Sequence, residues 1–107
     1  MENENKRYTV IVSEKAAEML VSHAQFLANV SEGAAKKLIE DFEIAANSLE
    51  MIPERNACLS NQDLPINKYR KLVFSKRYLM IYQIKKDRVY VDHIVDCRQN
   101  YGWLLGL

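Results

Sequence analysis

Residues 69–95 read YRKLVFSKRYLMIYQIKKDRVYVDHIV, and this segment decides the fold because three strand-like runs are separated by short polar breaks. The runs are residues 69–74, 77–84 and 89–95. They are rich in β-branched and aromatic side chains, which favour β-strands. The breaks at residues 75–76 and 85–88 are polar and short enough for tight turns. The segment therefore predicts three strands in an antiparallel meander.

The N-terminal half predicts one strand followed by two helices. Residues 6–12 (KRYTVIV) have the composition of a strand. Ser13 is a good helix N-cap, and apolar residues then recur at three- and four-residue spacing to about Ala28. Ser31 caps a second helix of this kind, which we expect to end at about Ile52 because a proline follows. The short connection between the two helices predicts an antiparallel helical hairpin.

The order of these elements predicts an α+β fold. It is β-α-α-β-β-β, with the helical hairpin packed on one face of a curved antiparallel sheet. Residues 53–68 form a loop that is longer than most connections, which indicates a functional or mobile segment. A length of 107 residues is typical of one domain, so we expect residues 1–107 to form a single unit.

Positive charge is concentrated in the C-terminal part of the chain. Residues 1–67 hold six Lys/Arg and eleven Asp/Glu, a net charge of −5. Residues 68–107 hold nine Lys/Arg and three Asp/Glu, a net charge of +6, so the whole chain carries only +1. Such an asymmetry indicates an anionic partner and points to nucleic acid. The simpler alternative is that these charges only solvate an exposed sheet.

The composition excludes several classes of protein. The apolar runs are too short to span a bilayer, and the polar start has no apolar signal segment, so we expect a cytoplasmic protein without a membrane partner. Cys58 and Cys97 are the only cysteines, and neither histidine lies at ligand spacing from them, so we expect reduced thiols and no metal. The motifs of phosphate loops, dinucleotide sites and serine hydrolases do not occur, so we expect no cofactor.

Four segments follow the strand and the helical hairpin in a recognisable order: YRKLVF, KRYLMIYQI, VYVDHIV and DCRQNYGWL. Together, over residues 6–104, they resemble the RelE/ParE superfamily of bacterial type II toxins. The resemblance implies a small poison that a co-expressed antitoxin holds inactive. RelE-like members cut messenger RNA in the ribosomal decoding site, whereas ParE-like members share the fold but target DNA gyrase. The fold alone does not choose between these activities.

The resemblance also implies candidate catalytic residues. In RelE-like toxins the RNA supplies its own 2′-hydroxyl nucleophile, so the protein must neutralise the scissile phosphate and move protons. Arg98 aligns with the family's C-terminal arginine and suits the phosphate, although a salt bridge to Asp96 or Asp92 is the alternative. Tyr101 would stack on a base or hydrogen-bond to the RNA, or else it packs on the sheet beside Trp103.

A basic cluster supplies the predicted nucleic-acid contacts. Arg70 aligns best with a strand lysine of the family and is a third catalytic candidate, although a shift of one residue would substitute Lys71. The predicted phosphate-binding residues are Lys68, Lys71, Lys76 and Arg77. Their binding to nucleic acid would fall steeply with salt. The alternative is a solvated strand edge whose lysines discourage edge pairing.

Two positions depart from the nuclease pattern. Leu79 stands where many RelE-like ribonucleases have an arginine, and Asn100 stands where one subgroup has a histidine. Asparagine does not titrate, so another base would be needed. His93 could serve if it faces outward, although a half-buried strand residue is the simpler expectation. We expect His23 at the surface and Cys97 to be a small buried residue rather than a nucleophile.

Three functions remain open at this point. The favoured hypothesis is a RelE-like endoribonuclease that cuts messenger RNA on the ribosome. The first alternative is a ParE-like protein that binds DNA gyrase without nuclease chemistry. The second is a catalytically degenerate member that only binds its antitoxin. In each case, any exposed part of the apolar helix stripes would suit an amphipathic helix of the antitoxin.

Overall fold

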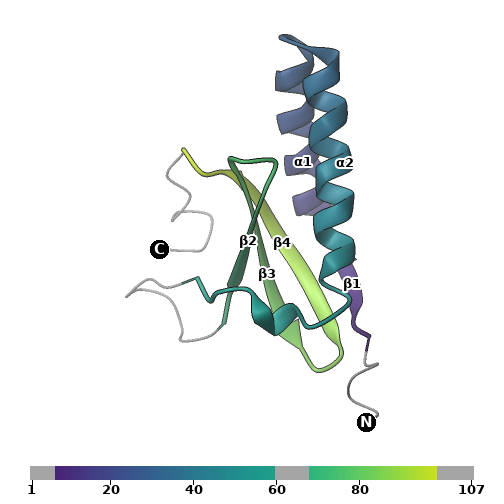
Figure 1. The fold of residues 1–107 in the computed structure, drawn as a ribbon, viewed down its shortest axis with the longest axis vertical. Helices are drawn as coiled ribbons and strands as arrows, with labels where there is room; N and C mark the ends of the chain where they lie inside the picture. The colour runs from purple at the N-terminus through teal and green to yellow at the C-terminus, as the bar shows by residue number, and fades with distance from the viewer. Residues whose placement is uncertain (1–6, 60–67, 99–107) are drawn as a thin grey trace.

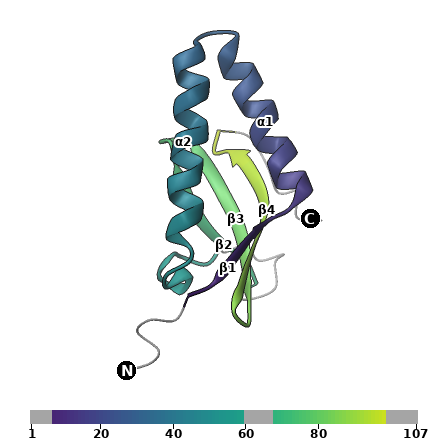
Figure 2. The ribbon, with the colours of Figure 1, turned by 90° about the vertical axis from the view of Figure 1, so that its right-hand side faces the viewer.

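The structure is a computed structural model that describes residues 7–59 and 68–98 (Figure 1). The elements are β1 (Thr9–Val12), α1 (Glu14–Ala28), α2 (Glu32–Ser48), the short 3-10 helix η2 (Pro53–Arg55), β2 (Arg70–Phe74), β3 (Tyr78–Lys85) and β4 (Arg88–Asp96). The two helices form an antiparallel hairpin on one face of a four-stranded sheet (Figures 1 and 2). The predicted α+β class and element order are therefore confirmed.

The sheet is mixed rather than wholly antiparallel. Its strand order is β1-β4-β3-β2, and the β2–β3 and β3–β4 pairs are antiparallel, as expected for the meander. However, β1 runs parallel to β4, from the pair Thr9↔Arg88 to the pair Val12↔Val91. Parallel neighbours need a long connection, and the helical hairpin supplies it by carrying the chain across one face of the sheet. The expectation of an antiparallel sheet is thus corrected at this edge.

Both helices begin at the predicted serine caps. The Ser13 hydroxyl accepts a hydrogen bond from the backbone N–H of Ala16 at 3.0 Å, and the Ser31 hydroxyl accepts one from Ala34 at 3.2 Å. These bonds satisfy N–H groups that have no partner within the helix. α2 ends at Ser48, four residues before the predicted limit at Ile52.

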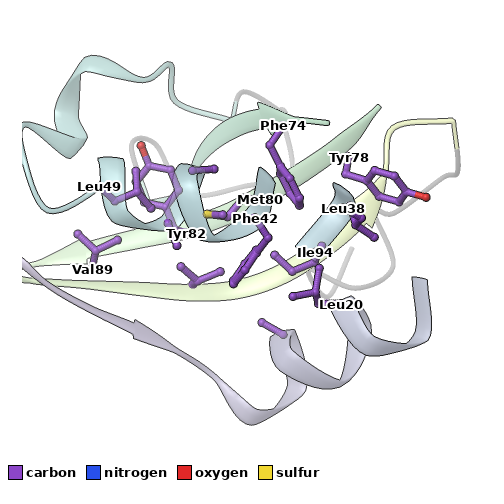
Figure 3. Close-up of a cluster of buried hydrophobic side chains, with 14 residues drawn as sticks. Leu20, Leu38, Phe42, Leu49, Phe74, Tyr78, Met80, Tyr82, Val89 and Ile94 are labelled. Carbon is purple, nitrogen blue, oxygen red and sulfur yellow. The ribbon is translucent and has the colours of Figure 1, made fainter. Parts of the chain in front are cut away.

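The main core lies between the helical hairpin and the sheet (Figure 3). Its largest fully buried side chains include Tyr82, Leu38, Leu49, Met80 and Ile94. Phe42 of α2 meets Phe74 of β2 edge to face, with ring centroids 5.9 Å apart. Apolar burial of this kind is the principal stabilising contribution to the fold.

The opposite face of the sheet, which we call the far face, carries a second and smaller apolar cluster. It consists of Leu59, Leu79, Ile81 and Val95, with Met19 and Tyr69 packed against it. Leu79 is thus a buried core residue, which explains why an apolar side chain stands at this position of the sequence.

A β-bulge in β4 decides which of its side chains face the helices. The register changes between Ile81↔His93 and Tyr82↔Val91, so Asp92 is an extra residue in β4. Strict alternation from Val91 would turn His93 toward the helices and Ile94 away from them. Because of the bulge, Ile94 joins the main core and His93 lies opposite Ile81 on the far face.

α1 covers the part of the β4 edge that β1 does not reach. β1 pairs with β4 only as far as Val91, whose carbonyl accepts the backbone N–H of Ser13 at 3.0 Å. Further along, the Nε2 atom of His23 donates a hydrogen bond to the carbonyl of Ile94 at 3.0 Å. The expectation that His23 is a surface residue is therefore wrong: it is half-buried and satisfies a strand edge.

The segment from Glu50 to Asn56, which we call the elbow, follows α2. Side chains of β2, of β3 and of the residue just before β1 form hydrogen bonds to it. The Tyr82 hydroxyl donates to the carbonyl of Pro53 at 2.8 Å in a buried setting. The Arg70 guanidinium donates to the carbonyls of Glu54 at 2.9 Å and Asn56 at 2.7 Å. Tyr8 donates to the Glu54 carboxylate at 2.6 Å. The elbow is therefore fixed relative to β3.

The elbow contains a strained residue, and relieving it is expected to stabilise the protein. Ile52 has a φ angle of 50°, in the left-handed region that a β-branched residue disfavours, and its side chain is 60% exposed. Ile52→Asn should raise the free energy of unfolding by about 1 kcal/mol, because asparagine tolerates this conformation. Chemical denaturation measures the change. The control, Ile44→Asn at an exposed position of α2, should not stabilise, so an equal gain there would contradict the argument.

Candidate functional site

The predicted arginines Arg77 and Arg98 meet at one end of the sheet, where Tyr78 of β3 pairs with Asp96 of β4. We call Arg77, Tyr78, Asp96, Arg98 and His23 the tip cluster. Arg77 and Arg98 both act electrostatically on the Asp96 carboxylate, which shows their proximity. In addition, the backbone carbonyl of Arg77 accepts the N–H of Cys97 at 2.7 Å, which ties the two strands together beyond the last pair.

Arg98 makes a bidentate ion pair with Asp96. Its Nε lies 3.1 Å from Oδ1 and its Nη2 lies 2.8 Å from Oδ2, while its backbone N–H donates to Oδ1 at 2.9 Å. The hydrogen bond from the Arg98 side chain holds the pKa of the Asp96 carboxyl below its usual range. Asp96 is buried, whereas the Arg98 side chain is 62% exposed. Arg98 therefore neutralises a buried carboxylate and still presents its guanidinium edge to solvent.

The aromatic part of the tip cluster is centred on Tyr78. The Arg77 guanidinium lies 5.7 Å from the Tyr78 ring centroid, within cation–π range. The centroid of the His23 ring lies 5.1 Å from the centroid of the Tyr78 ring. Tyr78 is 3% exposed, so it supports the charged groups around it and offers little surface of its own. The tip cluster can bind an anion through two guanidinium groups.

The other predicted basic residues do not gather at the tip cluster in one patch. Arg70 pairs with Tyr82, and the two share the helix face, where Arg70 binds the elbow. Lys71 pairs with Ile81 on the far face. Lys68 is exposed, with its ammonium 5.2 Å from the ring centroid of Tyr69. Alternation along β2 therefore separates the two strand candidates.

Lys76 and Arg77 lie in the β2–β3 turn, close to α2. Lys76, Arg77 and Tyr78 line a small open groove of about 200 Å³ together with Lys37 of α2. These residues place further positive charge next to the tip cluster. Tyr101 and Asn100, which the sequence also singles out, lie outside the described residues, so the prediction for Tyr101 stays a prediction.

His93 is buried on the far face rather than turned toward solvent. It is 8% exposed, and its Nδ1 has no hydrogen-bond partner within the described part of the chain. Burial lowers its pKa, the Lys15 ammonium lowers it further, and the neighbouring Asp92 carboxylate opposes this. Asp92 itself accepts a hydrogen bond from Gln83. His93 is therefore a neutral strand residue near pH 7 that does not face outward, and it is more deeply buried than the half-buried residue of the simpler expectation.

The buried imidazole of His93 predicts a stability loss in mild acid. Its folded-state pKa lies below the ordinary value of 6.5, so below that pH the unfolded state takes up a proton that the folded state does not. The free energy of unfolding should therefore fall as the pH drops below 6.5. His93→Leu should flatten this dependence in denaturation curves measured across the interval. An unchanged slope in the variant would assign the acid sensitivity to other groups.

Cys97 differs from the expectation. It is exposed rather than buried. Partial burial of the thiol and the adjacent Asp96 carboxylate raise its pKa, which disfavours the thiolate that a nucleophile needs.

Across residues 7–59 and 68–98, no three His, Cys, Asp or Glu side chains come close enough to hold a metal ion. Neither described helix is long and apolar enough to cross a membrane.

A larger open groove of about 550 Å³ runs between α2 and β2. Its apolar floor includes Ala45, Leu72 and Phe74, and Ile44 beside it is 70% exposed. Its polar lining residues are Lys37, Asp41, Ser48, Ser75 and Lys76. Lys37 and Asp41 form an ion pair at 3.3 Å, so Lys76 supplies the net positive charge of this apolar groove, which suits an amphipathic segment that carries acidic residues.

The arrangement can neutralise an anion, but proton transfer has no evident agent among the described residues of the tip cluster. Asp96 is held ionised by Arg98, and the Nε2 of His23 is used on the carbonyl of Ile94. Sequence reasoning missed His23. The predicted first and last strands have seven residues each, so the sequence carries no signal that part of β4 has no strand partner on this side.

Comparison with known proteins identifies a family and a solved structure with a similar fold. A family model described as "ParE toxin of type II toxin-antitoxin system, parDE" matches residues 10–101. Among solved structures, the fold is similar to a chain of the "Chromosomal ParDE TA system from P. aeruginosa". The TM-score is 0.69 at 15% sequence identity, and the match covers 86% of this chain and 98% of that chain. No curated protein matches.

Proposed function

Since this chain belongs to the ParE toxin family, and is thus the toxin of a ParDE type II toxin–antitoxin module, we propose that it inhibits DNA gyrase by binding and does not cut RNA. The superfamily offers both activities on one fold, so the choice depends on the side chains. The family match favours the gyrase alternative over the RelE-like nuclease that the basic C-terminal part suggests.

The separation of those nuclease candidates that lie within residues 7–59 and 68–98 is the observation that carries this proposal. RNA cleavage needs a phosphate-binding cation and a titratable group at the same reacting atoms. Here Arg70 is bound to the elbow on the helix face, and His93 is buried on the far face. Arg98 lies at the tip cluster with an ionised aspartate as its partner. This arrangement supports binding through charge more than it supports proton transfer.

Two assays test the activity. With purified gyrase, the purified chain should inhibit supercoiling of relaxed plasmid DNA. In cells that express the chain without antitoxin, messenger RNA 5′-ends should show no codon-phased cuts. Codon-phased cleavage together with unaffected supercoiling would overturn the proposal in favour of the RelE-like nuclease. Neither effect, in a chain that still binds its antitoxin, would support the degenerate member.

The family implies an antitoxin partner, and we assign it to the groove between α2 and β2. The groove offers an apolar floor beside α2, and Lys76, which no acidic residue of the groove pairs with, favours an acidic amphipathic helix over a basic one. Ile44 is the exposed apolar side chain at its margin. The sequence expectation that part of an apolar helix stripe serves the antitoxin applies to this surface.

Replacing Ile44 by aspartate is expected to weaken antitoxin binding by roughly tenfold or more, because a charge would enter an apolar interface. The matched control is Val73→Asp, since Val73 is 54% exposed but pairs with Leu79 on the far face. Affinity is measured by calorimetry with the cognate antitoxin. Equal losses in the two variants would place the antitoxin elsewhere.

A further inference from the structure

The turn between β3 and β4 carries a second set of cations, well away from the tip cluster. We propose that Lys85, Lys86 and Arg88, arranged around Tyr90, form a docking surface for the phosphate backbone of duplex DNA. We call these four residues the turn cluster. The inference goes beyond the proposed function, because it concerns DNA binding by this chain without gyrase.

The turn cluster is organised by the Tyr90 side chain. The Lys85 ammonium lies 5.8 Å from the Tyr90 ring centroid, and the Tyr90 side chain raises the pKa of Arg88. These residues line an open, largely polar groove of about 360 Å³ together with Lys86 and Asp87. The three cations are exposed, and Tyr90 is half-buried. One aromatic ring therefore holds two cations on the same surface.

The arrangement has a cost in the absence of an anion. Lys85 and Arg88 are directly paired across the two strands, and like charges at such a position destabilise a sheet. Asp87, in the turn itself, acts on Arg88 and balances only part of this charge. Asp92, further along β4, accepts a hydrogen bond from Gln83. A bound polyanion would remove the repulsion, which explains why cations are placed here.

The position of the turn cluster favours DNA over an isolated anion. It lies at the lower end of the sheet in Figures 1 and 2, where β3 extends three residues beyond its pairing with β2. β1 pairs with β4 as far as Arg88, so this end is the edge of a three-stranded part of the sheet, and the exposed β3–β4 turn projects from it. Duplex DNA carries one negative charge per roughly 1.7 Å of its axis, so closely spaced cations can each reach a phosphate.

The turn cluster is distinct from the tip cluster. Lys85 follows Tyr78, at the tip cluster, by seven residue steps along β3. At a rise of about 3.3 Å per residue, the two ends lie roughly 23 Å apart. A change in the turn cluster should therefore leave the ion pair between Arg98 and Asp96 intact.

The test measures binding of the full chain to a short fluorescein-labelled DNA duplex over a series of salt concentrations. Three phosphate contacts would contribute about 2.7 to the slope of log affinity against log salt, and Lys85→Gln should lower the slope by about 0.9. The control is Lys36→Gln, an exposed lysine of α2 with the same charge change, which should leave the slope unchanged. Lys85→Gln should melt at the same or a higher temperature, since the like-charge pair is gone.

Two outcomes would overturn the inference. Equal slopes for the Lys85 and Lys36 variants would show that these cations only solvate the turn. Competition by polyglutamate as effective as that by unlabelled DNA of equal charge would assign the surface to an acidic protein. Because the assay contains no gyrase, a failure here leaves the proposed inhibition of gyrase to its own test.

Discussion

Replacing Phe42 by alanine is expected to lower the free energy of unfolding by about 3–5 kcal/mol. Phe42 is 8% exposed and packs edge to face on Phe74, at the contact between α2 and β2. Truncation would lose its apolar burial, leave a cavity and remove the aromatic contact. Denaturant unfolding measures the change. Domains of this size are stable by only about 5–15 kcal/mol, so the variant should be markedly less stable.

The helical hairpin provides a matched control for this substitution. Phe26 of α1 is 66% exposed, and the same change to alanine should alter stability by at most about 0.5 kcal/mol. Similar losses in the two variants would mean that the core does not lie between the hairpin and the sheet as described.

Replacing Arg98 by alanine is expected to abolish most of the growth inhibition that the chain causes when it is expressed without antitoxin. The loss should be roughly tenfold or more in the concentration needed to inhibit the target, because a guanidinium group exposed at the tip cluster would be removed. The same change leaves the buried Asp96 carboxylate without its ion-pair partner, so the melting temperature should also fall.

A second substitution separates these two effects. In Asp96→Asn/Arg98→Ala no buried charge remains unpaired, and the asparagine oxygen can still accept the backbone N–H of residue 98. The melting temperature should recover toward that of the wild type, while inhibition stays lost. If inhibition returns together with stability, Arg98 has only a structural role at the tip cluster.

The parts of the fold that depend on local sequence were predictable. Ser13 and Ser31 cap their helices, and the tight turns appear at the expected breaks, because these features are determined by neighbouring residues. The direction of β1 was not predictable in this way. It depends on which edge of the completed meander pairs with the first strand, and long-range packing rather than local sequence decides this.

The candidate site was predicted only in part, for reasons of register. Arg77 and Arg98 come together because both lie at the end of the β3–β4 pair. Arg70 was aligned with a catalytic lysine, but the pairing Arg70↔Tyr82 turns it toward the helices, where backbone carbonyls of the elbow bind it. The face of the sheet on which His93 lies depends on the bulge at Asp92. A single extra residue of this kind leaves no mark in the alternation of apolar and polar residues along the sequence.

The central place of β4 has a consequence for the timing of folding. β4 is the last described strand to be synthesised, yet it lies between β1 and β3 and supplies part of the main core. A nascent chain that lacks β4 cannot join its first strand to the meander, so the complete sheet forms only after translation has passed this strand. No nascent chain that stops before β4 can therefore present the complete fold of the toxin.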